Sequence, residues 1–301
     1  MLSSIGSRAA ADPEELHFRR EARSRFVRTF LRYPAALPAL ILFVIVVLCA
    51  LGAPLLTQYT PFEGNAAERL QGIGTAGHLL GTDEQGRDIL TRCLYGARIS
   101  LLVGICSVIV AGVIGTLLGL ISGYYGGWAD RIIMRIADAF HAIPRILLAM
   151  VVLFVMGPSV FTLIMVIGVT NWVSYARIIR SEVLSVKEKE YVKASRTIGT
   201  GNFAIIRKHI LPNVFAQFIV VSTISVASSI IIEATMSFLG LGIQPPTVSW
   251  GVMLADGRNY LATQWWVCTF PGIAITLTVL GIMFLGNWLR DVLDPKNQGI
   301  R

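Results

Sequence analysis

The sequence predicts an all-α membrane protein with six transmembrane helices and both termini in the cytoplasm. Of its 301 residues, 54% are hydrophobic and only 15% are charged, whereas a soluble domain carries roughly a quarter charged residues. The apolar residues gather in long runs, and most lysines and arginines gather between alternate runs. This composition argues against a soluble globular enzyme and against a disordered chain.

Six apolar segments are long enough to cross a bilayer, whose hydrocarbon core needs about 20 helical residues. The third segment is less apolar than the others, because Asp138, His141 and Arg145 interrupt its first half. The predicted spans are Ala35–Leu56, Ile99–Tyr124, Ile132–Met156, Val160–Ile179, Val214–Leu239 and Trp265–Leu289.

The distribution of lysine and arginine sets the orientation of these spans. Twenty of the 26 lie before the first span, between the second and third, after the fourth, or in the tail, and five lie on the alternate side. Because lysine and arginine collect on cytoplasmic loops, both termini are predicted to be cytoplasmic. The same rule explains the net charge of +8 without a nucleic-acid partner.

The predicted organisation follows from the spans. Residues 1–34 form a cytoplasmic basic amphipathic segment, 35–56 the first transmembrane helix, 57–98 an outer connecting segment, 99–290 a core of five transmembrane helices, and 291–301 a cytoplasmic tail. The leading segment is too long for the charged region of a signal peptide. Asp12, Pro13 and Glu15 predict a helix start there, and its basic and apolar faces suit the inner leaflet of the membrane.

Three carboxylates in the outer connecting segment, Asp83, Glu84 and Asp88, are of the residue type that binds metal ions. Their spacing lacks the pattern of a calcium-binding loop, and Arg87 lies among them. We therefore predict no metal site, but a capped amphipathic helix whose apolar face is Ile89, Leu90, Cys93 and Leu94. The four cysteines lie far apart, so no zinc site or disulfide framework is predicted.

Several polar residues lie inside the spans. Glu233 is mid-span, where a carboxylate is costly, so it either faces a watery pathway or gate or belongs to a buried structural pair. Asp138 is a similar candidate, although Arg135 or His141 can pair with it on the same helix. Asn171 can hydrogen-bond to a neighbouring helix. Small residues in the second span permit close helix packing: Gly104, Gly112, Gly115 and Gly119.

The longest polar stretch on the cytoplasmic side is Arg180–Pro212, and it carries the signals of two short helices. Ser185 and Glu188 form a capping box that predicts the first helix start. Gly199 stands where a helix-ending glycine belongs. The apolar stripe of this first helix is Tyr191, Ala194 and Ile198.

A Gly-x-Gly turn at Gly199–Gly201 leads to the second helix, which Asn202 is predicted to cap and Pro212 to end. Its apolar stripe is Phe203, Ile206 and Ile210. Two such stripes outside the membrane must be buried by something, either the chain's own spans or a groove on a partner. The alternative interpretation is a solvated charged loop.

This stretch resembles the EAA loop of bacterial ABC importer permeases, whose pattern is Glu-Ala-Ala, three residues, Gly, nine residues, then Ile-x-Leu-Pro. Lys193, Ser195 and His209 depart from that pattern, while the Ala–Gly–Leu-Pro spacing matches. Four further segments resemble the C-type permeases for dipeptides, oligopeptides, glutathione and nickel: His78–Gly104, Gly123–Phe140, Ser237–Leu254 and Leu289–Lys296. Arg145 is a local departure, because that group usually has a small or apolar residue after the proline.

The resemblance implies a type I ABC importer permease of the bacterial inner membrane, a non-catalytic subunit that forms half of a pathway for peptides or a related small solute. Its implied partners are a second homologous permease, two ATP-binding subunits, an extracytoplasmic solute-binding protein and membrane lipid. The 180–212 loop would couple closure of the ATPase to the spans. The implied coupling residues are Tyr191, Lys193, Ala194, Ser195, Ile198, Gly199, Leu211 and Pro212.

No cofactor is expected on this chain, because it has no GxxxxGK[ST] phosphate loop and ATP would be bound by the partner subunits. The alternative function is a proton-coupled secondary transporter in which Glu233 or Asp138 relays protons, although most such folds have internal repeats and more spans. An intramembrane enzyme is a third alternative, but the chain has neither HExxH nor GxSxG.

Overall fold

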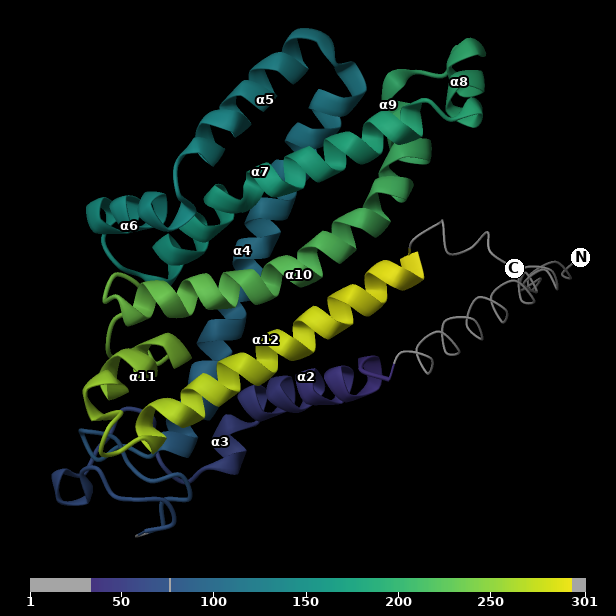
Figure 1. The fold of residues 1–301 in the computed structure, drawn as a ribbon. Coiled ribbons are helices and arrows are strands. Elements are labelled where there is room, and N and C mark those ends of the chain that lie inside the picture. The colour runs from purple at the N-terminus through teal and green to yellow at the C-terminus, as the bar shows by residue number, and fades with distance from the viewer. Residues whose placement is uncertain (1–33, 76, 294–301) are drawn as a thin grey trace, which may run out of the picture.

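The computed structural model describes residues 34–75 and 77–293, and within these ranges the protein is all-helical (Figure 1). The predicted N-terminal helix and most of the predicted tail lie outside the described residues. The α-helices are α2 (Ala36–Leu51), α3 (Ala53–Leu56), α4 (Ile89–Tyr125), α5 (Gly127–Ala142), α6 (Arg145–Met156), α7 (Val160–Lys187), α8 (Glu190–Thr197), α9 (Asn202–Ile205), α10 (Leu211–Phe238), α11 (Trp250–Gly257) and α12 (Trp266–Leu293). Short 3₁₀ turns are formed by Ala66–Glu68 and Arg258–Tyr260, and a π-helical turn by Ile206–Ile210.

Among the described residues, four helices are long and apolar enough to cross a membrane: α4, α7, the continuous helix Asn202–Phe238 that contains α10, and α12. A bent pair, α5 with α6, would make a fifth span. The first predicted span is divided, because α2 has 16 residues and α3 follows a break at Gly52. Four to five spanning helices are therefore established, and the count of six stays a prediction.

The third predicted span, Ile132–Met156, was expected to be one helix and is two. The axes of α5 and α6 differ by 87°, and the break falls at Ile143 and Pro144. Proline has no backbone N–H, and it forces the preceding residue out of the helical region. Ile143 accordingly has an extended backbone, with φ −94° and ψ 129°.

The most extensive helix–helix contact joins α4 and α7. Gly115 and Gly119 on α4 make it possible, since a Cβ at these positions would lie 2.5 Å from the Trp172 carbonyl oxygen and 2.7 Å from that of Ala176. Gly104 and Gly112 instead pack against Ile230 and Phe218 of α10. The prediction that these four glycines serve helix packing is confirmed for contacts within the chain.

The outer connecting segment is irregular up to Asp88, which caps α4 by accepting a hydrogen bond from the Thr91 N–H at 2.7 Å. The predicted amphipathic helix near residue 89 and the predicted span from Ile99 are one continuous helix. Asp83 is buried and pairs with two arginines, Arg87 (2.7 Å) and Arg92. Both arginines also reach Asp256 of α11, at 3.3 and 3.0 Å. This network fastens the outer segment to α11.

The described residues contain no group of acidic, histidine or cysteine side chains that could hold a metal ion.

Helix α11 was not predicted. It is amphipathic only weakly and lies in the outer loop after α10, where Ser249 caps it and Trp250 donates its indole N–H to the Cys93 carbonyl at 2.9 Å.

Candidate functional site

The candidate coupling site is the turn between α7 and α10, which holds α8 and α9. Figure 1 shows these two short helices at the opposite end of the bundle from α11 and the outer segment. The predicted capping box is wrong, because Ser185 lies inside α7, and α8 begins at Glu190 without a side-chain cap. The reason is that α7 continues eight residues past the predicted end of its span at Ile179.

Gly199 ends α8 in the predicted way. Its φ is +83°, in the left-handed region that costs a residue with a Cβ roughly 1–2 kcal/mol. The Gly199 N–H bonds to the Arg196 carbonyl and the Thr200 N–H to the Ser195 carbonyl, both at 3.1 Å. These bonds satisfy carbonyls that the end of the helix leaves free.

The second predicted helix differs at both ends. Gly201, not Asn202, is the N-cap residue, and the Asn202 side chain instead accepts a hydrogen bond from the Tyr124 hydroxyl at 2.9 Å. Pro212 does not end the helix, because it lies just after the π-helical turn Ile206–Ile210, where the regular i→i−4 hydrogen bonding is already interrupted. The chain is therefore helical from Asn202 to Phe238, through a π-helical turn.

The loop is held to the spans by an apolar cluster. Val192 of α8 and Ile205 and Ile210 of the following helix are fully buried. They pack against residues at the ends of α4 and α7, including Tyr124, Val183 and Val186. Val192 and Ile205 were absent from the predicted stripes, whereas Ile206 and Ile210 of the second stripe do pack in this cluster. The self-packing face is therefore offset from the predicted one on α8 and overlaps it on the second helix.

The predicted stripe of α8 is largely exposed. Tyr191 is 44% exposed, Ile198 is 82% exposed, and Ala194 is also exposed. Phe203 of α9 is 76% exposed beside them in the loop. We call Tyr191, Ala194, Ile198 and Phe203 the coupling surface. Since a separate set of residues packs on the chain's own spans, these four are available to a partner.

Polar contacts fix the shape of the loop behind this surface. The Ser195 hydroxyl lies 3.2 Å from Nε2 of His209, and the rings of Tyr191 and His209 lie 5.7 Å apart. Lys193 pairs with Glu188 at 2.9 Å. This hydrogen bond from Lys193 holds the pKa of the Glu188 carboxyl below its usual range, so the ion pair is complete at neutral pH and is lost as the pH falls through that lowered value. Leu211 and Pro212 are exposed at the base of the loop.

Glu233 of α10 is fully buried and has serine partners only. It accepts hydrogen bonds from the hydroxyls of Ser100 on α4 (2.9 Å), Ser237 on α10 (2.9 Å) and Ser249 at the start of α11 (2.8 Å). No lysine or arginine in the described ranges lies within 4 Å of it. Of the two predicted alternatives, a pathway or gate and a buried structural pair, these contacts fit the second in altered form, because the carboxylate joins three helices through hydroxyl groups and not through a cation.

Asp138 was predicted to pair with Arg135 or His141 of its own helix, but it pairs with neither. It pairs with Arg177 of α7 at 2.8 Å, because α5 and α7 lie side by side and place the two side chains opposite each other. Asn171 does join two helices, as predicted. Its partner is Arg145 of α6, which donates Nη1 at 3.1 Å to the amide oxygen.

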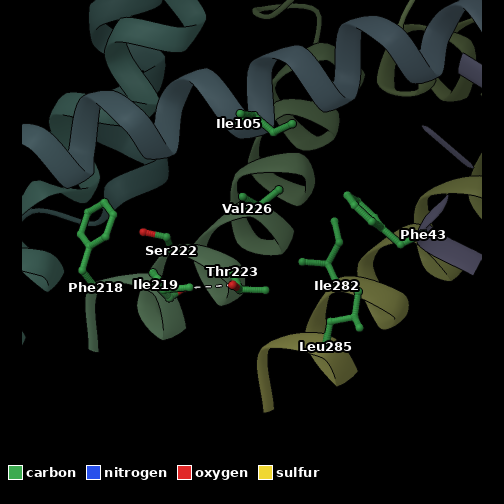
Figure 2. Close-up of a pocket in the computed structure, with 9 residues that line it drawn as sticks. All are labelled: Phe43, Ile105, Phe218, Ile219, Ser222, Thr223, Val226, Ile282 and Leu285. Atoms are coloured by element: carbon green, nitrogen blue, oxygen red, sulfur yellow. Dashed lines mark hydrogen bonds between the residues drawn. The ribbon is translucent and has the colours of Figure 1, made fainter. Parts of the chain in front are cut away.

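A cavity of about 330 Å³ lies between α2, α4, α10 and α12. Figure 2 shows that its walls are hydrocarbon apart from the hydroxyls of Ser222 and Thr223, and Thr223 is bonded to the Ile219 carbonyl at 2.9 Å. It is lined by Phe43, Ile105, Phe218, Ile219, Ser222, Thr223, Val226, Ile282 and Leu285. With no charged group in its walls, this cavity is not suited to bind an ion or a carboxylate.

An apolar helical bundle with an exposed helical loop between two long spans is the architecture of an integral membrane protein. Its sequence matches the binding-protein-dependent transport system inner membrane component over residues 115–299, and the N-terminal transmembrane domain of oligopeptide transport permease C over residues 23–72. The chain belongs to this family of permeases, and it is a multi-pass protein of the inner membrane.

Curated relatives agree with this assignment. The chain is 45% identical to the dipeptide transport system permease protein of Alkalihalophilus pseudofirmus, with 87% of this chain and 86% of that protein covered. It is 38% identical to the di/tripeptide transport system permease of Pseudomonas aeruginosa, over 98% of both chains. It is 41% identical to the glutathione transport system permease of Pectobacterium atrosepticum, over 90% of both.

A solved structure of the MetNI methionine ABC transporter, in an inward-facing conformation, shares the fold with a TM-score of 0.55 and 21% identity. The match covers 67% of this chain and 96% of that one. The fold is therefore that of type I ABC importer permeases. These findings support the role of a permease subunit in an ABC importer, and they give no support to the alternative of a proton-coupled transporter.

Proposed function

We propose that this permease forms half of an ATP-driven import pathway for peptides. Relatives that resemble it over most of their length are named for dipeptides, for di- and tripeptides and for glutathione, which are all solutes with peptide bonds and free carboxylates. The chain crosses the membrane six times with both termini in the cytoplasm, and it pairs with a second homologous permease. An extracytoplasmic solute-binding protein delivers the peptide, and two further subunits bind and hydrolyse ATP, so this chain needs no cofactor of its own.

The observation that carries this proposal is the exposed coupling surface. Exposed apolar side chains grouped on one loop are typical of an interaction site, and Ile198 and Phe203 are the most exposed of them. Exposed basic residues surround the patch, among them Arg196, Arg207 and Lys208. The complementary site on an ATP-binding subunit is then an apolar groove with an acidic rim.

The connections of the loop explain how closure of the ATPase would reach the pathway. Helix α8 is linked to α7 by only two residues, and α9 is continuous with α10. The buried Val192 and Ile205 tie both short helices to the ends of α4 and α7. A displacement of the coupling surface is therefore transmitted to the spans as a movement of packed helices.

Site-directed crosslinking tests the proposal. In the purified complex, with the native cysteines replaced by alanine, Ala194→Cys labelled with a maleimide that carries a benzophenone should crosslink to an ATP-binding subunit on irradiation. Ala67→Cys is a matched control, because Ala67 is also an exposed alanine but lies in the outer segment. It should give no such product. Absence of the Ala194 product in a complex that still imports the dipeptide Ala-Ala would overturn the assignment of the coupling surface.

A further inference from the structure

Arg145 is held in a fixed position at the break between α5 and α6. It is the first residue of α6, and its guanidinium donates Nη1 to the Asn171 amide oxygen (3.1 Å) and Nη2 to the Ser174 hydroxyl (3.0 Å). Both acceptors belong to α7. The side chain nevertheless stays exposed. Two hydrogen bonds therefore orient the guanidinium without covering it.

The charge of Arg145 is not neutralised by the described part of the chain. Asn171 and Ser174 are neutral, and no carboxylate there lies within 4.0 Å of the guanidinium. The nearby acidic residue of α5, Asp138, is paired with Arg177. An arginine has five N–H donors, and these contacts use two of them. Three donors and a full positive charge remain for another group.

The depth of Arg145 in the bundle restricts what its charge can face. Asn171 and Ser174 lie about 16–21 Å along α7 from its first residue, Val160, which is near the middle of that 28-residue helix. A cation that faces lipid at such a depth is strongly disfavoured, and intramembrane charges almost always face protein or water. The same face carries further polar groups, the exposed His141 and the ion pair of Asp138 with Arg177. This face is therefore directed away from lipid, to water or to another subunit.

We propose that Arg145, oriented by Asn171 and Ser174, lines the translocation pathway and binds the carboxylate of the solute in transit. A guanidinium matches a carboxylate in both shape and charge. The same charge repels a free metal cation, so the site favours peptides and glutathione over a bare metal ion. This inference rests on the proposed permease function, and it adds a solute-binding residue within the membrane.

The test uses the assembled complex in liposomes, with the four native cysteines replaced by alanine. Ala142→Cys supplies the reporter thiol, because Ala142 is exposed at the end of α5, three residues before Arg145. Its rates of reaction with an anionic and a cationic methanethiosulfonate reagent are compared. Both reagents should react, and Arg145→Gln should lower the anionic-to-cationic rate ratio about tenfold, while Arg145→Lys keeps most of it. Arg131→Gln is the matched control and should leave the rate ratio unchanged. Arg131 is also an exposed arginine, but it lies about 16 Å along α5 from the reporter Ala142.

The solute supplies the second readout. Ala-Ala delivered by the binding protein during ATP turnover should slow modification of the reporter thiol severalfold, and much less after Arg145→Gln. If neither reagent reacts, if the ratio ignores Arg145→Gln, or if Ala-Ala gives no protection, the proposal is wrong. ATP-dependent uptake of Ala-Ala is measured in the same liposomes. Normal uptake with an unprotected reporter thiol counts against Arg145 alone, whereas no uptake by the unaltered complex counts against the proposed function.

Discussion

The Ser195 hydroxyl lies 3.2 Å from Nε2 of His209, so two positions at which the coupling loop departs from the family's usual pattern contact each other. The usual residues there are alanine and isoleucine, which would make an apolar contact. In this chain a hydrogen bond takes the place of that contact between α8 and the π-helical turn. The two departures are thus one structural change.

Ser195→Ala and His209→Ile are predicted to be non-additive. Ser195→Ala removes the contact of Nε2 of His209, and His209→Ile leaves the Ser195 hydroxyl with only the Tyr191 carbonyl at 2.9 Å. Each single change should weaken the attachment of α8 by about 1 kcal/mol. The double variant restores an apolar contact and should lie close to the unaltered protein. Hydrogen exchange of the α8 amides in the purified complex measures this. Effects that simply add would contradict the coupling.

Gly199→Val should abolish ATP-dependent uptake while the protein remains inserted in the membrane. The valine is strained by about 1–2 kcal/mol at φ +83°, so the turn that presents the coupling surface is altered. Gly201→Val is the matched control, because Gly201 has φ −65° and equally open surroundings. Uptake by Gly199→Val at the level of Gly201→Val would show that the left-handed turn is dispensable.

Glu233→Ala should destabilise the protein by on the order of 3 kcal/mol, because the hydroxyls of Ser100, Ser237 and Ser249 lose their common buried acceptor. Glu233→Gln keeps one carbonyl oxygen and should cost less than half as much. Thermal unfolding of the detergent-solubilised protein provides the comparison. Equal stability of all three proteins would show that Glu233 has no structural role and would favour its alternative role in the pathway or gate.

Two arginine–aspartate contacts should differ in their value to stability. Arg92→Met removes a buried arginine that pairs with Asp83, and it is expected to cost more than about 1 kcal/mol but less than the about 3–5 kcal/mol of breaking a sole buried pair, because Arg87 still pairs with Asp83. Arg177→Met breaks an exposed pair with Asp138 and should cost about 0–1 kcal/mol. Chemical denaturation of both variants measures the difference. A larger effect for Arg177 would mean that a partner subunit buries the second pair.

The two cysteine positions of the crosslinking experiment, Ala67→Cys and Ala194→Cys, also test the orientation of the chain in the membrane. On whole spheroplasts, a membrane-impermeant maleimide should label Ala67→Cys at once, but Ala194→Cys only after the membrane is permeabilised. The expectation follows from the excess of lysine and arginine on the side of the coupling loop. Labelling of Ala194→Cys in sealed spheroplasts would mean that the chain has the opposite orientation in the membrane.

The sequence alone was sufficient to predict a helical membrane protein with its apolar segments and to locate the turn at Gly199. Long apolar runs can only dissolve in lipid as helices, and Gly199 signals its own backbone conformation, so local chemistry was sufficient for both. The break at Pro144 had a local signal as well, the proline itself, which the charges around it obscured.

The partners of the polar groups could not be predicted from the sequence, because they depend on how the helices pack. Asp138 pairs with Arg177 and Glu233 with three serines because helices distant in sequence bring these side chains together. The faces of α8 were assigned for the same reason, since Val192 is buried by the ends of α4 and α7 while Ile198 is left exposed. Periodicity predicts that a helix has an apolar face, but the packing of the whole bundle decides which apolar residues remain available to another chain.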